Sequence, residues 1–203
     1  MTRGAAAIGA GLDPVRSARP IRAGERIHVV GAAGAGASAA ALLASAAGAF
    51  VTACDAGGAS PYTRAFDAAG LVLEPEHDPR HVRTSPRPER LAVTKALTAI
   101  DPDHPELRAA RELGIAVEPW QQLIADAAAD KTLVAVAGTH GKSTTAGWLV
   151  HVLTEAGLDP SAFVGALLPP ASKDGAAATA RTGEGTVFKK EMLSLLKKIS
   201  PFL

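Results

Sequence analysis

Short apolar runs alternate along the chain with alanine- and leucine-rich stretches of helical length. Three elements are predicted near the start: a strand over 26–30, a helix over 36–48 and a strand over 50–54. Gly31 follows the first strand and Gly48 ends the helix, where a glycine is a common stop signal. A strand, a glycine turn, a helix and a second strand form one βαβ unit, which makes the two strands parallel. The pattern therefore predicts an α/β fold.

The alternation continues to residue 130 less regularly and then becomes clear again. Further strands are predicted at 71–73, 91–94 and 115–117, and helices at 61–69, 105–113 and 120–129. The segment 75–90 holds four prolines and seven charged residues and is predicted to be a loop. The clearest strand is 131–137, and a glycine-rich turn and a helix over 143–156 follow it.

Composition and charge exclude several classes of protein. The chain has 203 residues, is 47% hydrophobic and carries a net charge of +1, which argues against disorder and against general nucleic-acid binding. A single cysteine excludes a disulfide scaffold. The longest nearly uncharged stretch, 27–54, is mostly Ala, Gly and Ser and would insert poorly into a bilayer. We expect a cytoplasmic protein with no membrane or nucleic-acid partner.

Both ends of the chain differ from its middle. Residues 1–25 show no hydrophobic period and are predicted to be a flexible extension. Residues 189–203 contain four lysines but no arginine or alanine, and a small amphipathic helix is possible over 191–199. The composition of this tail is atypical of the rest of the chain and indicates a sequence foreign to the parent domain. A natural basic helix is the alternative.

The first candidate site is the turn between the strand at 26–30 and the helix after it. It has the spacing G-x-x-G-x-G, formed by Gly31, Gly34 and Gly36. Glycines let backbone N–H groups approach a pyrophosphate at a helix N-terminus, and Asp55 ends the next strand, where an acid can reach a ribose hydroxyl. The spacing departs from the usual dinucleotide fingerprint, so a phosphate site and a plain tight turn both remain open.

The second candidate site is the turn between the strand at 131–137 and the next helix. It reads Gly138-Thr139-His140-Gly141-Lys142-Ser143-Thr144-Thr145. Backbone amides of such a loop can wrap a triphosphate, the Lys142 ammonium can pair with its β- and γ-phosphates, and the Ser143 hydroxyl can ligate Mg²⁺. The loop is shorter than the standard phosphate-binding form, and an ordinary strand-to-helix turn is the alternative.

These two motifs, in this order, resemble the Mur ligases, which form amide bonds in peptidoglycan precursors. The loop 138–145 is similar to their ATP loop, and its histidine is most like that of the members joining L-alanine to UDP-N-acetylmuramate. The segments 27–38 and 51–55 resemble the UDP-binding turn of the family, and 91–117 resembles the stretch that follows it.

The resemblance implies a Rossmann-like UDP-sugar-binding domain over 26–128 and the start of a P-loop ATPase-like domain over 129–188. It implies ATP and Mg²⁺ as cofactors, and a carboxylate activated as an acyl phosphate that the amine of L-alanine attacks. Lys142 would be catalytic and would bind ATP with the rest of its loop, residues 138–144, and Ser143 would hold the metal. The implied UDP-sugar contacts are Gly31, Gly34, Gly36, Ser38, Asp55 and His77.

The chain also departs from the family pattern. Beyond residue 188 the family has a strand with acidic Mg²⁺ ligands, whereas here Lys189 and Lys190 begin the tail. The remaining central domain and the third domain are not recognisable, so we expect this chain to be inactive alone. A ligase that attaches recycled peptide to the same sugar, a non-catalytic UDP-sugar module and, from the first turn alone, a NAD-binding protein are the alternatives.

Other residues have structural interpretations. Cys54 is expected to fill the core rather than act as a nucleophile, Trp120 and Trp148 to be core residues, and His104 to start a helix. For His77, a substrate contact and a solvated loop position are both open. No Cys/His group shows the sequence spacing of a zinc site.

Overall fold

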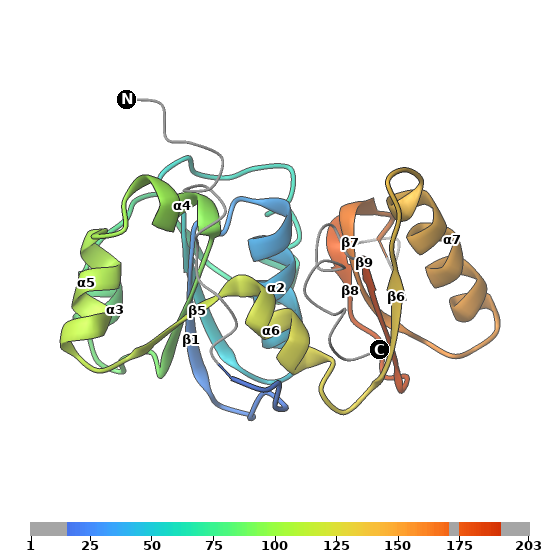
Figure 1. Ribbon diagram of the computed structural model, residues 1–203, viewed down its shortest axis with the longest axis horizontal. Helices are drawn as coiled ribbons and strands as arrows, with labels where there is room; N and C mark the ends of the chain where they lie inside the picture. Colours follow the sequence, from blue (N-terminus) through green and yellow to red (C-terminus); the bar gives the residue numbers. More distant parts are fainter. Residues whose placement is uncertain (1–15, 171–174, 192–203) are drawn as a thin grey trace.

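The computed structural model describes residues 16–170 and 175–191, and these form two sheets in five layers (Figure 1). Glu191 ends a strand and is not helical, while the rest of the possible helix at 191–199 and the start of the extension lie outside the described residues. Helices α3 (Arg80–Arg83) and α5 (Pro105–Glu112) cover one face of the first sheet. Helices α2 (Ala35–Ala46) and α6 (Trp120–Ala127) lie between the two sheets, and α7 (Lys142–Glu155) covers the far face of the second.

The first sheet is parallel throughout and has the order β3-β2-β1-β4-β5. Its strands are β1 (Arg26–Val30), β2 (Phe50–Cys54), β3 (Leu73–Glu74), β4 (Arg90–Val93) and β5 (Ala116–Pro119). The strand order reverses between β1 and β4, and open sheets of this kind bind ligands beyond the carboxyl ends of the strands at such a point. The α/β class predicted from the alternating pattern is confirmed.

The second sheet has the order β6-β9-β7-β8, with only β8 antiparallel to its neighbour. Its strands are β6 (Thr132–Val136), β7 (Ser161–Leu168), β8 (Ala178–Arg181) and β9 (Val187–Glu191). Strand β9 lies between β6 and β7 and runs past residue 188, where the sequence changes character.

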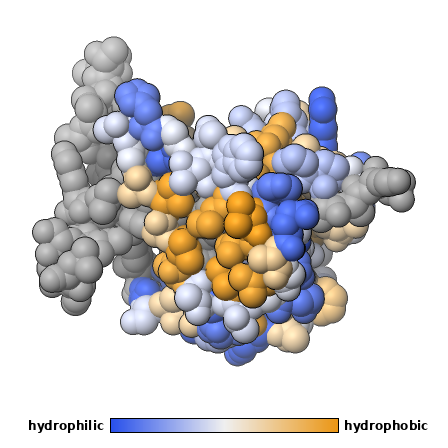
Figure 2. Space-filling model, turned by 90° about the vertical axis from the view of Figure 1, so that its right-hand side faces the viewer, coloured by the Kyte–Doolittle hydropathy of each residue, from blue (hydrophilic) through white to orange (hydrophobic). Residues whose placement is uncertain are grey.

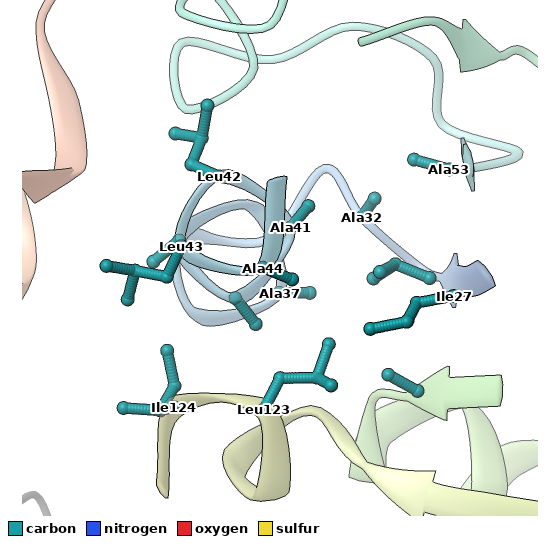
Figure 3. Packing of buried hydrophobic residues seen from close by; sticks show 14 of the residues in the cluster. Ile27, Ala32, Ala37, Ala41, Leu42, Leu43, Ala44, Ala53, Leu123 and Ile124 are labelled. Atoms are coloured by element: carbon teal, nitrogen blue, oxygen red, sulfur yellow. The ribbon is translucent and has the colours of Figure 1, made fainter. Parts of the chain in front are cut away.

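Helix α2 is the centre of the main core because its small side chains allow close packing on both sides. Its residues 37–44 are all buried, and six of these eight are alanine or serine. Figure 3 shows Ala37 and Ala44 facing Leu123 and Ile124 of α6, with Ile27 of β1 alongside. Toward the second sheet, Trp120 at the start of α6 packs against Phe163 of β7, with ring centroids 5.7 Å apart. The two sheets therefore share one hydrophobic core through α2 and α6.

Several local predictions were wrong. Only a three-residue 3₁₀ helix, η1 (Asp67–Ala69), forms within the predicted helix 61–69, because Thr63 and Phe66 are its only buried residues. The predicted loop 75–90 contains α3, and α4 (Lys95–Ile100) was not predicted. Within the described residues, no helix is long and apolar enough to cross a bilayer.

Residues 16–25 have no helix or strand but are fixed to the first sheet by ion pairs. Arg16 pairs with Glu118 at 2.9 Å and with Asp126 at 2.6 Å. Arg19 pairs with Glu25 at 2.5 Å, and its backbone N–H donates to Asp126. This part of the predicted flexible extension therefore has defined contacts.

Arg90 is the centre of this ion-pair network and is almost completely buried. Its guanidinium lies 3.2 Å from Glu25, 3.0 Å from Glu118 and 2.5 Å from Asp126. Burial alone would raise the pKa of Asp126, but hydrogen bonds from Arg16 and Arg90 outweigh it and leave the pKa below its usual value. Burial would also raise the pKa of Glu25, but the hydrogen bond from Arg19 and its other cationic partners outweigh burial, so this pKa is lowered too.

The lowered carboxyl pKa values predict that the network stabilises the fold only above acid pH. A carboxyl whose folded pKa is depressed contributes stability above its unfolded pKa, about 4, and loses it as the pH falls through the folded value. We therefore expect the urea concentration at the midpoint of unfolding to decrease as the pH is lowered from 5 to 3, because the contribution of this network is lost over that range. The Asp126→Asn variant should be less stable than the native chain at pH 6, and its urea midpoint should decrease less as the pH falls. Parallel pH profiles for the two proteins would contradict this assignment.

Candidate functional site

The turn between β1 and α2 has three glycines with three different roles. Gly31 has φ +78°, and a Cβ there would lie 2.5 Å from Thr94. A Cβ on Gly36 would lie 2.3 Å from the Trp120 ring, so this glycine allows α2 to pack against α6. Gly34 is exposed, and no atom of a described residue outside its chain neighbours lies within 4 Å of a Cβ position there. Only Gly34 therefore leaves space on the open side of the turn.

Asp55 fixes this turn from the end of β2. Its Oδ2 accepts a hydrogen bond from the Ala33 N–H at 2.9 Å, and its Oδ1 accepts one from the Gly57 N–H at 2.8 Å. The helix after the turn begins at N-cap Gly34 without a side-chain cap, so no side chain competes with a ligand for its first N–H groups. The arrangement is suited to an anion, and Asp55 orients the backbone that would bind it.

Ser38 is placed differently from the other predicted contacts. It is fully buried, its hydroxyl donates to the Ala35 carbonyl at 3.1 Å, and it lies 3.4 Å from the Thr179 hydroxyl of β8. It therefore has no exposed surface for a ligand in this conformation, and the geometry gives its predicted role no support.

The second turn, residues 137–141, lies between β6 and α7. Gly141 is the N-cap of α7 with φ +74°, a left-handed conformation that favours glycine, and no side chain caps the helix. Thr139, His140 and Thr144 are exposed, as is Gly138, and Ser143 is partly exposed. The Lys142 ammonium folds back over the loop and donates to the carbonyls of Gly138 at 2.7 Å and Thr139 at 3.2 Å. A cation thus lies over an open helix N-terminus, as phosphate binding requires.

A third group of polar side chains gathers on the α3/α5 face of the first sheet, which the sequence did not predict. His28 of β1, Cys54 of β2, His81 of α3 and Glu106 of α5 bring their donor atoms within 4.8 Å of one another. The group could not be predicted from the sequence because its four residues lie far apart along the chain and no two of them belong to one short motif.

His77 belongs to this neighbourhood rather than to solvent. Its Nδ1 lies 3.3 Å from the Cys54 sulfur, and its ring meets that of His104 edge-on at 4.7 Å. His104 is the N-cap of α5, and its side chain accepts a hydrogen bond from the Glu106 N–H, as predicted for a residue that starts a helix. Of the two interpretations of His77, the solvated loop position is wrong, while the substrate contact stays a prediction.

Burial and charge set the protonation of this group. Burial would raise the pKa of Glu106, but the His28 and His81 rings and the Asp78 N–H hold it at about 2. Burial, and then the neighbouring Glu106 carboxylate, raise the pKa of the Cys54 thiol above its usual value. Cys54 is therefore a protonated core residue in the conformation described, which fits the prediction that it is not a nucleophile.

One prediction about the aromatic residues was wrong. Trp120 is packed in the main core, but Trp148 on α7 is 66% exposed. Three other large apolar side chains of the second-sheet region are also exposed: Val152, Leu158 and Leu167. Figure 2 shows a hydrophobic patch on the face of the molecule where α7 lies.

A family model described as "Mur ligase family, catalytic domain" matches residues 26–132, more than half of the chain. The chain belongs to the Mur ligase family. The resemblance stated from the two glycine turns is thereby confirmed, and the Rossmann-like character of the first sheet agrees with it.

Two relatives show what this Mur ligase chain is similar to. It is 45% identical over 95 residues to a UDP-N-acetylmuramate–L-alanine ligase of Frankia alni, covering 43% of this chain and 16% of that protein. It is 39% identical over 119 residues to the enzyme of the same name from Deinococcus radiodurans, covering 59% of this chain and 23% of that protein. The chain thus spans less than a quarter of the length of these relatives.

Solved Mur ligase structures have the same fold. The UDP-N-acetylmuramate–alanine ligase of Thermotoga maritima aligns with a TM-score of 0.67 at 27% identity, over 82% of this chain and 37% of that one. A UDP-N-acetylmuramate:L-alanyl-γ-D-glutamyl-meso-diaminopimelate ligase from Neisseria aligns with the same score at 26% identity, over 83% of this chain and 52% of that one. Both sheets of this Mur ligase chain therefore have counterparts among its relatives.

Proposed function

We propose that this chain binds a UDP-sugar at the turn after β1 and magnesium–ATP at the loop after β6. We further propose that it forms part of an ATP-dependent ligase that joins L-alanine to UDP-N-acetylmuramate. The observation that carries the proposal is Lys142, whose ammonium lies over the open N-terminus of α7. The names of the relatives in Frankia and Deinococcus support the choice of substrates.

The residues of the loop fit a nucleotide triphosphate. Its amides lie at a helix N-terminus without a side-chain cap, and Lys142 can exchange its two carbonyl contacts for phosphate oxygens. Ser143, the next residue on α7, would hold Mg²⁺ through its hydroxyl, which is a hard oxygen ligand of the kind that ion prefers. Bound magnesium would supply charge neutralisation at the phosphates, and Gly138 to Thr144 would position them.

The reaction that follows is a phosphoryl transfer and then an acyl transfer. The sugar carboxylate attacks the terminal phosphorus of ATP, the bond to ADP breaks, and an acyl phosphate forms. The amine of L-alanine then attacks the acyl carbon, and phosphate leaves as the amide forms. In this scheme Lys142 stabilises the negative charge on the transferring phosphoryl group.

The first turn would bind the pyrophosphate of the sugar nucleotide. Gly34 offers the open approach, Gly31 the sharp bend, and Asp55 keeps the Ala33 amide in place. Gly36 would contribute indirectly, since its lack of a side chain lets α2 pack against Trp120. His77 would reach the substrate from the loop after β3.

One alternative has an observation in its favour. The ligase from Neisseria, which is named for a tripeptide rather than for L-alanine, aligns as well as the L-alanine enzyme of Thermotoga. A recycling ligase therefore remains the second candidate. The two would be separated by assaying the whole protein with L-alanine and with the tripeptide as competing amines.

The binding proposal is tested by isothermal titration of this chain with UDP-N-acetylmuramate. We expect one site, and we expect Gly34→Val to weaken binding at least about tenfold because its side chain would block the open side of the turn. The free energy of unfolding should fall by no more than about 1 kcal/mol, because a Cβ at Gly34 meets no described atom within 4 Å and the cost is that of replacing an N-cap glycine.

Two controls make the titration specific. Gly34→Ala should give a smaller loss than Gly34→Val, and magnesium–ATP binding should be the same in both variants, because its loop lies on the second sheet. No heat with UDP-N-acetylmuramate, or equal affinity of the native chain and Gly34→Val, would refute the proposed sugar site. Binding of NADH instead of the UDP-sugar would favour a dinucleotide protein.

A further inference from the structure

We propose that His28, Cys54, His81 and Glu106 form a binding site for a zinc ion inside the first sheet domain. The four side chains come from β1, β2, α3 and α5, and their donor atoms lie within 4.8 Å of one another. The site lies next to the first nucleotide turn, since the Cys54 carbonyl accepts hydrogen bonds from the Gly31 and Ala32 N–H groups, but its donor atoms are not those proposed to bind the nucleotides and the proposal does not depend on that function.

The spacing of the donor atoms fits a tetrahedral metal ion. Zinc–nitrogen and zinc–sulfur bonds of about 2.0 to 2.3 Å place neighbouring ligands roughly 3.3 to 3.7 Å apart. The Cys54 sulfur lies 3.4 Å from each oxygen of Glu106, and His28 Nε2 lies 3.8 Å from Glu106 Oε1. His81 Nδ1 lies 2.7 Å from Glu106 Oε1, a hydrogen bond that the ion would replace.

His28 supplies the observation that points most directly to a ligand. Its ring is 1% exposed, yet its Nε2 has no hydrogen-bond partner among the residues that the structure describes, although a buried polar atom is normally satisfied. The opposite nitrogen, Nδ1, lies 2.7 Å from the Thr52 hydroxyl. When Nδ1–H donates to that hydroxyl, Nε2 presents a lone pair to the cluster, which is the arrangement of a metal-bound histidine.

The charge of the cluster also fits a divalent cation. Glu106 is completely buried, and within the described residues its ion-pair partners are histidines, with no arginine or lysine among them. A carboxylate and a thiolate together with Zn²⁺ sum to zero charge, which removes the cost of a lone buried anion. Thiolate and imidazole ligands favour zinc over magnesium or calcium.

An ion can reach the site from one side. The His81 side chain is 17% exposed, and a surface pocket of about 510 Å³ has Thr52, Arg80 and His81 in its lining. Bound zinc would connect β1 and β2 to α3 and α5, and it would fix the loop that carries His77. We therefore expect a structural ion that orders this face of the domain.

Cobalt is the first test, since Co²⁺ substitutes for zinc and reports its ligands by colour. The whole chain, without a histidine tag and freed of metal by chelation, is titrated with Co²⁺ and then with Zn²⁺. We expect one equivalent of Co²⁺ to give tetrahedral d–d bands and a thiolate charge-transfer band, and zinc to displace it. Cys54→Ala should remove the charge-transfer band.

Affinity measurements on matched variants complete the test. His81→Ala should weaken zinc binding at least about hundredfold, whereas His151→Ala, on the exposed surface of α7, should bind as the native chain does. Zinc should raise the melting temperature of the native chain but not that of His81→Ala.

The proposal is overturned by either of two results. One is a native chain that gives no thiolate–cobalt band, and this result does not depend on any variant folding. The other is a His81→Ala protein that binds zinc as tightly as His151→Ala, which would make the cluster a hydrogen-bond network only.

Discussion

Replacing Arg90 with methionine is expected to lower the free energy of unfolding by about 3–5 kcal/mol. The substitution keeps most of the side-chain volume but removes the buried cation that faces Glu25, Glu118 and Asp126. Arg16 and Arg19 approach the same acids from the partly exposed side, and the exposed Arg22 lies 3.8 Å from Glu25, so the three carboxylates would keep only solvated cations as partners among the described residues. The measurement is urea unfolding at pH 7, followed by circular dichroism.

Two further variants separate the buried charge from a general effect of losing an arginine. Arg108→Met removes an exposed ion pair with Asp103 and should cost less than about 1 kcal/mol. Arg90→Lys keeps the charge but lacks the planar guanidinium that reaches several carboxylates. Its loss of unfolding free energy should therefore lie between those of Arg90→Met and Arg108→Met. A cost for Arg90→Met as small as that of Arg108→Met would show that the network contributes little.

Replacing Lys142 with methionine is expected to weaken binding of magnesium–ATP about ten- to hundredfold. A hydrogen bond to a charged group contributes about 1.5–3 kcal/mol, and Lys142 is positioned to make such bonds to the phosphates. Stability should be unchanged, because the contacts of the ammonium with described residues are to carbonyls of its own exposed loop. Titration with magnesium–ATP and with magnesium–tripolyphosphate measures the effect, and the second probe isolates the phosphates from adenine.

The control for this variant is Lys95→Met, which removes a lysine from α4 on the first sheet. It should bind both probes as the native chain does, and binding of UDP-N-acetylmuramate should be equal in all three proteins. Equal affinity of Lys142→Met and Lys95→Met for tripolyphosphate would show that the loop does not bind phosphate through this lysine.

The sequence predicted those elements that form by local rules. Strands β1 and β2 are apolar runs ending in glycine or an acid, and helices α2, α5 and α7 end just before Gly48, Gly114 and Gly157. Each of these glycines has a positive φ, which explains why the pattern located the helix ends well. Both candidate turns follow a strand and precede a helix, as predicted.

Two kinds of element were missed. Strand β7 has local turn signals on both sides, Asp159-Pro160 before it and Pro169-Pro170 after it, so the sequence does carry a signal for it. Strand β8 is a short segment, Ala178–Arg181, that depends on its pairing with β7. The zinc cluster joins residues from β1, β2, α3 and α5, so spacing rules for zinc ligands could not find it. Gly36 shows the same limit, because the need for glycine comes from Trp120, more than eighty positions away.

Strand β9 has a consequence for synthesis on the ribosome. It is the last described strand in the sequence but occupies an inner position, between β6 and β7. The first sheet can complete itself as soon as β5 has emerged, whereas β6 and β7 must wait with unpaired edges until residues 187–191 arrive. Unpaired strand edges in a nascent chain attract other chains, so chaperone binding should be greatest during that interval.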